Sequence, residues 1–260
     1  MHDPAAYGEA LGAEYDALYP STRFDTEAAV AAIAELAGAD GAVLEFGIGT
    51  GRLALPLSRR GHRVVGIDAS PAMVEQLRSK PGGDSIDVVI GNYTDASAPG
   101  EFAVVVLAVN GITDPSSRDE QIACFRNAAR HLAPGGCFVV ETYVLASEQL
   151  SGEWTILPRY VAPDHVEVQL TRYEASASIL ERTLVHLLQD AVRLVTVRDN
   201  YAWPGELDLM ARMAGLRLLT RHAGWSREPF DGSSRKHVSV YQRTEAGSTG
   251  SGLDASAAGD

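Results

Sequence analysis

The residues best suited to chemistry are three glycines at alternate positions and an aspartate that follows them. Gly47, Gly49 and Gly51 come directly after the apolar run 42–46, and Asp68 ends the next apolar run. Glycines in this place let backbone N–H groups approach a ligand closely, and the helix that follows points its positive end there. A carboxylate on the neighbouring strand can accept both hydroxyls of a ribose. The pattern therefore predicts a site for a nucleoside-containing ligand.

Two classes of nucleoside cofactor compete for such a turn, and the glycine spacing separates them. Dinucleotide sites use G-x-G-x-x-G, and counting from Gly47 and Gly49 places the third glycine of that pattern at Arg52. The dinucleotide fingerprint therefore fails at this position. The sequence offers instead an acidic-x-G-x-G-x-G pattern that begins with Glu45.

The elements that must position this turn alternate between strands and helices. A helix that starts at Asp25 or Thr26 as its N-cap precedes the first strand and stops at Gly38. Short turns then join apolar runs to stretches with helical spacing, which favours a parallel, doubly wound α/β sheet. The expected strands are 42–46, 63–68, 86–90, 102–109 and 137–144, and the expected helices are 27–36, 52–60, 71–79 and 118–132.

Residues 151–203 follow a different pattern, in which apolar and polar side chains alternate with a period near two. This period is typical of half-exposed antiparallel strands, so we expect a β meander inserted into the α/β domain on its substrate side. A helix over 204–214 and strands over 216–222 and 238–241 follow. We predict one domain over 1–243 with a helical lead-in over 1–40, and a disordered tail over 244–260.

Composition narrows the possible partners. The chain has 22 Lys and Arg against 34 Asp and Glu, a net charge of −12 that repels phosphate backbones and anionic headgroups. We therefore expect no nucleic-acid or membrane partner and a cytoplasmic protein, since the start does not read as a signal peptide. Cys124 and Cys137 lack partners at metal-ligand spacing, so we expect free thiols and no metal site. The sequence leaves the oligomeric state open, a homo-oligomer included.

Three segments in order carry a family resemblance. The segment that runs from Glu45 to Gly51 resembles the first motif of class I S-adenosylmethionine-dependent methyltransferases, and 66–73 resembles the second. Gly91-Asn92-Tyr93 stands where a third segment of that family flanks the adenine. The resemblance covers about 7–243. It implies a seven-stranded Rossmann-like sheet, S-adenosyl-L-methionine as cofactor and S-adenosyl-L-homocysteine as product.

The resemblance also implies which residues bind the cofactor. The glycine turn would line the methionine and ribose, Asp68 would bind the ribose hydroxyls, and Asn92 would face the adenine amino group. Tyr7 and Tyr15 have the spacing of two tyrosines that face the cofactor in similar N-methyltransferases, and aromatic rings attract a sulfonium. The full set is Tyr7, Tyr15, Glu45, Gly47, Gly49, Gly51, Asp68, Ala69, Met73, Asn92, Tyr93 and Val109.

Within the family, the chain is similar to actinobacterial N-methyltransferases of secondary metabolism, both the amino-sugar and the linaridin-peptide types. The amino-sugar enzymes place a histidine shortly after the fourth strand, but this chain has Asn110 there, so that base does not transfer. The remaining candidates for a catalytic base are His186, His222, Tyr143 and Glu141, with His237 as a further histidine near the last strands.

These observations leave three hypotheses. The first is N-methylation of an amine in a small-molecule or peptide natural product. The second is O- or C-methylation of a phenolic or acidic natural product, which favours an essential base such as a histidine. The third is a protein that binds S-adenosylmethionine without turnover.

Overall fold

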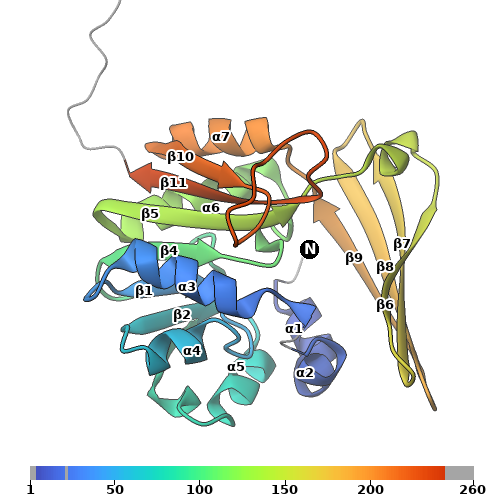
Figure 1. The fold of residues 1–260 in the computed structure, drawn as a ribbon, viewed down its shortest axis with the longest axis horizontal. Helices are drawn as coiled ribbons and strands as arrows, with labels where there is room; N and C mark the ends of the chain where they lie inside the picture. The colour runs from blue at the N-terminus through green and yellow to red at the C-terminus, as the bar shows by residue number, and fades with distance from the viewer. Residues whose placement is uncertain (1–3, 21–22, 244–260) are drawn as a thin grey trace, which may run out of the picture.

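The computed structural model describes residues 4–20 and 23–243, and its centre is a seven-stranded sheet (Figure 1). The strand order is β10-β11-β5-β4-β1-β2-β3; β11 runs antiparallel to both of its neighbours, and the pairs from β5 to β3 are parallel. The predicted doubly wound sheet is therefore confirmed. Its strands are β1 (Val43–Phe46), β2 (Val64–Asp68), β3 (Asp87–Ile90), β4 (Phe102–Leu107), β5 (Leu132–Tyr143), β10 (Leu216–His222) and β11 (Lys236–Arg243).

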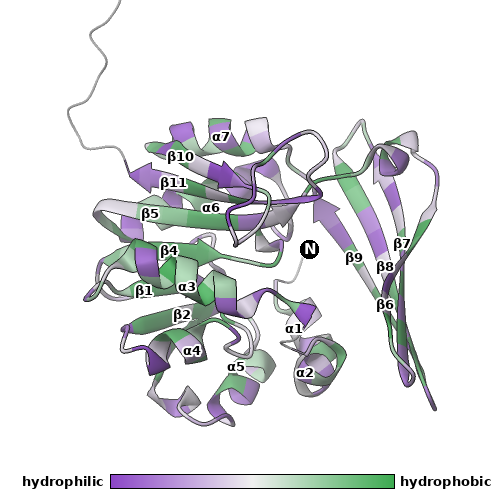
Figure 2. Ribbon diagram, in the orientation of Figure 1, coloured by the Kyte–Doolittle hydropathy of each residue, from purple (hydrophilic) through white to green (hydrophobic). Residues whose placement is uncertain are grey.

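Helices cover both faces of this sheet because successive strand residues point to opposite sides. Leu44 and Phe46 of β1 belong to a core that includes α6 and α7, whereas Val43 belongs to a second core that includes α3 and α4. Figure 2 shows the central strands as largely hydrophobic, as expected when both faces are buried. The helices are α3 (Thr26–Ala37), α4 (Ala54–Arg59), α5 (Pro71–Arg78), α6 (Arg118–His131) and α7 (Pro204–Met213).

A separate antiparallel sheet stands beside the central one, and the lead-in helices lie between the two (Figure 1). Its strands are β6 (Thr155–Val161), β7 (His165–Glu174), β8 (Ile179–Leu188) and β9 (Val192–Asn200). The lead-in consists of α1 (Ala6–Leu11), the 3₁₀ turn Gly12–Glu14 and α2 (Tyr15–Leu18). The predicted meander is confirmed. Strand β6 lacks a clear sequence signal because Pro158 interrupts it, and this edge position with its register shift is where a strand tolerates proline.

Several predicted boundaries differ from those in the structure. Strand β5 begins at Leu132, directly after α6, and the Pro134-Gly135-Gly136 segment forms a register shift against β4 instead of a separate loop. Asp25 is the N-cap of α3, but its side chain makes no capping hydrogen bond. The predicted disorder of 244–260 lies outside the described residues. No helix within 4–20 and 23–243 is both long and apolar enough to cross a membrane.

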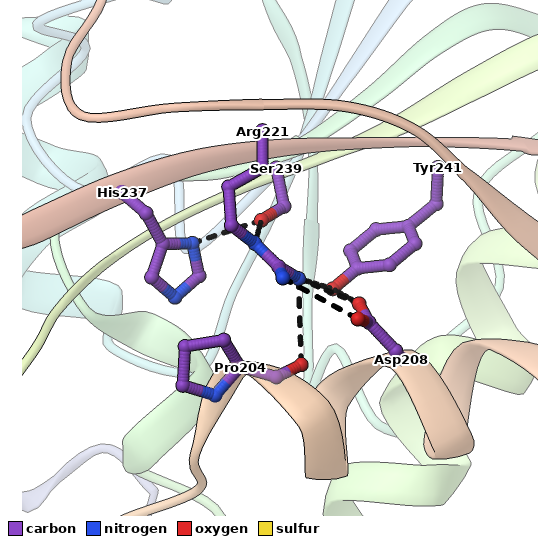
Figure 3. Close-up of polar contacts among 6 residues, drawn as sticks. All are labelled: Pro204, Asp208, Arg221, His237, Ser239 and Tyr241. Carbon is purple, nitrogen blue, oxygen red and sulfur yellow. Dashed lines mark hydrogen bonds and ion pairs between the residues drawn. The ribbon is translucent and has the colours of Figure 1, made fainter. Parts of the chain in front are cut away.

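A partly buried polar network connects α7 to the last two strands (Figure 3). The Arg221 guanidinium pairs with the Asp208 carboxylate at 2.5 Å, and its Nε donates to Ser239 Oγ at 2.8 Å. The Tyr241 hydroxyl donates to Asp208 Oδ1 at 3.0 Å, and Ser239 Oγ lies 2.8 Å from His237 Nδ1. Burial lowers the pKa of His237 to about 3, so its imidazole is neutral and serves this network.

Arg221→Met should destabilise the fold because the Asp208 carboxylate loses its cationic partner and Ser239 Oγ loses a hydrogen-bond donor. The pair is partly buried, so we expect the free energy of unfolding to fall by about 2 to 3 kcal/mol, below the full loss for a deeply buried pair. Urea unfolding monitored by circular dichroism measures this change. The matched control is Arg217→Met on the same strand, whose exposed guanidinium contacts Gln242. Equal losses in the two variants would contradict the role given to the network.

Candidate functional site

One large cavity, of about 1620 Å³, lies at the carboxyl edge of the parallel strands. Strands β1 and β4 are neighbours in the sheet, and the chain order runs outward from them in opposite directions. Open α/β sheets bind ligands at such a switch point, because the adjacent loops separate there. The cavity walls come from the lead-in helices, the loops after β1, β2, β3 and β4, and strands β6 to β9.

All twelve residues predicted to bind the cofactor line this cavity. They are Tyr7, Tyr15, Glu45, Gly47, Gly49, Gly51, Asp68, Ala69, Met73, Asn92, Tyr93 and Val109. Sequence positions as distant as Tyr7 and Val109 therefore meet in one place. Their individual roles toward a ligand stay predictions.

The glycine turn needs glycine at each of its three positions. Gly47, Gly49 and Gly51 have φ values of 64°, 53° and 85°, which side chains with a Cβ rarely adopt. At Gly51 a Cβ would also lie 2.3 Å from Leu77 Cδ1 of α5. The turn is thus held in one conformation with its backbone facing the cavity.

Asp68 fastens this turn to the next strand. Its Oδ2 accepts a hydrogen bond from Gly49 N at 2.7 Å, and its Oδ1 accepts one from Ser70 N at 2.9 Å. Each carboxylate oxygen has a further lone pair, and the side chain lines the cavity. Asp68 can therefore hold the turn and accept hydroxyl donors from a ligand at the same time. Burial raises the pKa of Asp68, and the two N–H donors oppose that shift.

Glu45 opens the motif and is almost completely buried. Its burial raises the pKa to about 8, which the charge of Arg52 opposes. Its Oε2 has no hydrogen-bond partner among the described residues. A buried acceptor without a partner is costly, so this carboxyl is suited to protonation or to a donor that enters the cavity.

The loop after β3 forms a second part of the wall. The Tyr93 ring stacks on Phe46 with centroids 5.9 Å apart, and its hydroxyl donates to Gly111 O at 2.8 Å. Asn92 Oδ1 accepts from Thr94 N at 3.0 Å. Met73 is buried beneath the glycine turn. Met73, Asn92 and Tyr93 therefore bring apolar, amide and aromatic groups together in this part of the cavity wall.

Three tyrosines at the start of the chain, Tyr7, Tyr15 and Tyr19, also line the cavity. The rings of Tyr7 and Tyr15 meet edge to face with centroids 6.5 Å apart, and Tyr15 lies 5.1 Å from Tyr19. Burial raises the pKa of Tyr7, and it raises that of Tyr15 to about 12. The phenols are therefore neutral near pH 7 and can offer hydrogen bonds or ring faces.

Ionic contacts hold the lead-in between the two sheets. Asp16 accepts from Thr50 Oγ1 at 2.7 Å and pairs with Lys80 at 2.5 Å, both on the side of the glycine turn. On the other side, Glu14 lies 3.3 Å from Arg193 of β9. The lead-in thus contacts both walls of the cavity and fixes the distance between them.

The wall opposite the glycine turn carries a polar set that the sequence analysis missed. Asp199 of β9 and Arg182 of β8 form a bidentate ion pair, in which Arg182 Nη2 donates to Asp199 Oδ1 at 2.9 Å. Asp114, after the 3₁₀ turn Gly111–Thr113, is exposed to the cavity. Two features of the sequence could have pointed to these residues. Arg182 and Asp199 are charged residues in strands that turn one face inward, and Asp114 follows a buried strand, where site residues of α/β proteins often lie.

The predicted catalytic candidates lie outside the cavity wall. The Tyr143 hydroxyl reaches it indirectly, since it donates to Asp199 Oδ2 at 2.8 Å. Glu141 Oε2 accepts from Val109 N at 3.1 Å. His222 pairs with Pro229 near the end of β10, away from these residues. The structure brings Tyr143 and Glu141 to the edge of the site, and their catalytic roles stay predictions.

His186 belongs to a buried group with His165 and Glu167, whose ligand-type atoms lie within 4.8 Å of one another. His186 Nδ1 is 3.1 Å from His165 Nε2, and its Nε2 is 3.2 Å from the Tyr19 hydroxyl. The guanidinium of Arg23 lies 2.7 Å from Glu167 Oε2, so a cation already neutralises the carboxylate that a metal would need. The predicted lack of a metal stays a prediction.

Comparison with known proteins gives consistent matches. A family model for a methyltransferase domain matches residues 43–136, which contain the glycine turn and Asp68. The chain is 31% identical over 248 residues to a cypemycin N-terminal methyltransferase from a Streptomyces species, a match that covers 94% of this chain and all of that protein.

Solved structures agree with this match. The CcbJ methyltransferase of Streptomyces caelestis has a TM-score of 0.84 and 35% identity over 94% of this chain and all of its own. The amino pentose methyltransferase CalS10 of Micromonospora echinaspora, solved with S-adenosylmethionine bound, shares the fold with a TM-score of 0.67 and 20% identity, over 88% of this chain and 96% of its own. Full-length similarity above 30% identity shows common descent, and the chain therefore belongs to the S-adenosylmethionine-dependent methyltransferases.

Proposed function

We propose that this enzyme transfers a methyl group to an amine of a peptide or small-molecule natural product. The observation that supports it best is the match over the whole length of a relative named as an N-terminal methyltransferase. A match over 94% of this chain is long enough to include the antiparallel sheet, which contributes to the wall opposite the glycine turn. The relative therefore resembles this chain in the acceptor half of the cavity as well as in the cofactor half.

The residues around the glycine turn fit S-adenosylmethionine. Asp68 retains lone pairs that could accept the ribose hydroxyls, and the apolar and aromatic side chains of Met73 and Tyr93 in the wall suit a flat base. Neutral phenols at Tyr7 and Tyr15 suit a sulfonium. When bound, the cofactor supplies an electrophilic methyl group on positively charged sulfur. The chain's task is then to align the acceptor with that methyl group and to exclude water.

The cavity has room for two reactants. Its volume of about 1620 Å³ exceeds the range of roughly 300 to 1,000 Å³ that holds one drug-sized ligand. The half formed by β8 and β9 remains for the acceptor. Charged groups line this half, among them Asp114, Arg159 and Arg182, which favours a polar acceptor over a purely apolar one.

O- or C-methylation is the alternative in the same enzyme class. It favours a base such as histidine, to deprotonate a hydroxyl or a carbon acid. No histidine of residues 4–20 and 23–243 lines the cavity. Carboxylates and phenols in the wall could also serve as a base, so the amine acceptor is favoured mainly by the full-length relative that is named as an N-terminal methyltransferase.

The direct test incubates the protein with methyl-labelled S-adenosylmethionine and matched acceptors. We expect label in peptides and small molecules with a free amine and none in their N-acetylated counterparts, with fragmentation placing the methyl group on nitrogen. Transfer to a phenol or carboxyl group alone would favour the alternative. Cofactor binding without transfer to any acceptor would favour a binding protein.

Asp68→Ala should weaken cofactor binding because it removes the acceptor for the ribose hydroxyls. A charge-assisted hydrogen bond contributes about 1.5 to 3 kcal/mol, so the Kd for S-adenosylhomocysteine should rise by roughly 10- to 150-fold. Isothermal titration calorimetry measures the Kd, and the thermal midpoint reports folding. Asp95→Asn, an exposed carboxylate change in the loop after β3, is the control and should leave the Kd unchanged. An unaltered Kd in Asp68→Ala would remove this residue from the site.

Glu45→Gln should change how stability depends on pH. The folded carboxyl has a pKa near 8 against a usual value of 4.5, so folding takes up a proton between these values. The stability contribution of Glu45 is thus greatest below pH 4.5 and is lost as the pH rises toward 8. Relative to the unchanged chain, the variant should gain about 2 to 4 kcal/mol between roughly pH 5 and pH 8.

Urea unfolding of both proteins at these two pH values measures that difference. Glu75→Gln, an exposed carboxyl on α5, serves as the control and should follow the unchanged chain. Parallel pH curves for Glu45→Gln and the unchanged chain would show that Glu45 is ionised in the folded state.

A further inference from the structure

Asp114 is the carboxylate of the acceptor half that has no partner of its own. It follows the 3₁₀ turn after β4, its backbone N–H donates to Gly111 O at 3.2 Å, and its side chain is exposed to the cavity. Within residues 4–20 and 23–243, its carboxylate forms no hydrogen bond or ion pair. Other carboxylates on this wall are occupied: Asp199 by Arg182, Glu14 by Arg193 and Glu167 by Arg23.

Asp114 lies in the acceptor half of the cavity, on the side that borders the predicted cofactor residues. The charged groups that act on it come from three other elements: Asp199 on β9, Arg182 on β8 and, more weakly, Asp68 at the end of β2. The charge of Asp114 in turn raises the pKa of the Tyr15 and Tyr93 phenols, which lie on the cofactor side. Asp114 is therefore near both the predicted cofactor residues and the acceptor wall.

The protein groups around Asp114 shift the pKa of its carboxyl. The surrounding cavity walls raise the pKa of the Asp114 carboxyl above the usual aspartate value, toward about 7. The charge of Asp199 adds to this shift, whereas Arg182 opposes it, and water in the open cavity reduces it because the side chain is exposed there. A base works best when its pKa lies near the operating pH. Asp114 is thus available both as an anion that pairs with an ammonium group and as a site that can hold a proton.

We propose that Asp114 binds the ammonium form of the acceptor and takes the proton that must leave nitrogen before methyl transfer. This inference rests on the proposed amine acceptor. The step moves one proton: an N–H bond of the ammonium breaks, an O–H bond forms on Asp114, and the nitrogen keeps the electron pair. The neutral nitrogen then forms its bond to the methyl carbon as the carbon–sulfur bond breaks, and its electron pair goes to sulfur. Asp114 later releases its proton to water.

A titration that needs no turnover tests the binding half. In protein labelled with ¹³C at aspartate carboxyl groups, one resonance lost in Asp114→Asn should titrate near neutral pH. Addition of an alanine-initiated tetrapeptide amide, with S-adenosylhomocysteine present, should lower that midpoint, because an ammonium group stabilises the carboxylate. The N-acetylated peptide should leave it unchanged. A midpoint in the usual aspartate range, or equal responses to both peptides, would overturn the proposal.

The kinetic half compares pH profiles. In the unchanged chain, kcat/KM for an amine acceptor should rise through the Asp114 titration. In Asp114→Asn it should fall by about 10²- to 10⁴-fold at neutral pH and rise instead through the acceptor's own amine titration. Asp119→Asn, an exposed change of equal charge on α6, is the control. A normal profile in Asp114→Asn with continued N-methylation would reject Asp114 and leave the proposed function intact, whereas transfer only to oxygen or carbon would reject the amine acceptor itself.

Discussion

The two hydrogen bonds that Asp68 accepts set the geometry of the site. They join Gly49 of the turn to Ser70 at the start of α5, so β1, β2 and α5 meet at one carboxylate. The turn itself has positive φ at three positions and has no regular secondary structure to hold it. The same side chain keeps lone pairs toward the cavity, so it is suited to hold the turn and to accept donors from a ligand at the same time. Burial of this carboxylate is tolerated because backbone donors stabilise its charge.

The second constraint is the distance between the two sheets. The central sheet supplies the glycine turn and the loops after β2, β3 and β4, and the antiparallel sheet supplies Asp199 and Arg182. The lead-in helices contact both sides, through Asp16 toward the glycine turn and Glu14 toward β9. The tyrosines of the lead-in lie between the two sheets. The cavity therefore depends on residues near the start of the chain, although the sheets contain most of its wall.

The sequence was most informative where a local pattern, such as glycine spacing or hydrophobic periodicity, decides the structure. The apolar strands and the period near two predicted both sheets, and the glycine spacing with Asp68 predicted a nucleoside site. The family resemblance supplied the rest of the twelve residues that line the cavity around the turn. The sequence was less informative where tertiary contacts decide. Pro158 obscured β6, and the segment after α6 formed a strand because β4 offered it partners. Asp114 and Arg182 have no motif, and their meeting depends on how the meander folds against the loop after β4. The candidate histidines were chosen by residue type, which carries no information on direction.

The account's central claim is that Asp68 and the glycine turn together hold the nucleoside of S-adenosylmethionine. The most direct measurement is a crystal structure of the protein with S-adenosylhomocysteine. We predict both ribose hydroxyls within hydrogen-bond distance of the Asp68 carboxylate, with the adenine between Met73 and Tyr93 and the amino acid end toward Tyr7 and Tyr15. A nucleoside bound elsewhere in the cavity, with Asp68 contacting only Gly49 and Ser70, would contradict the account.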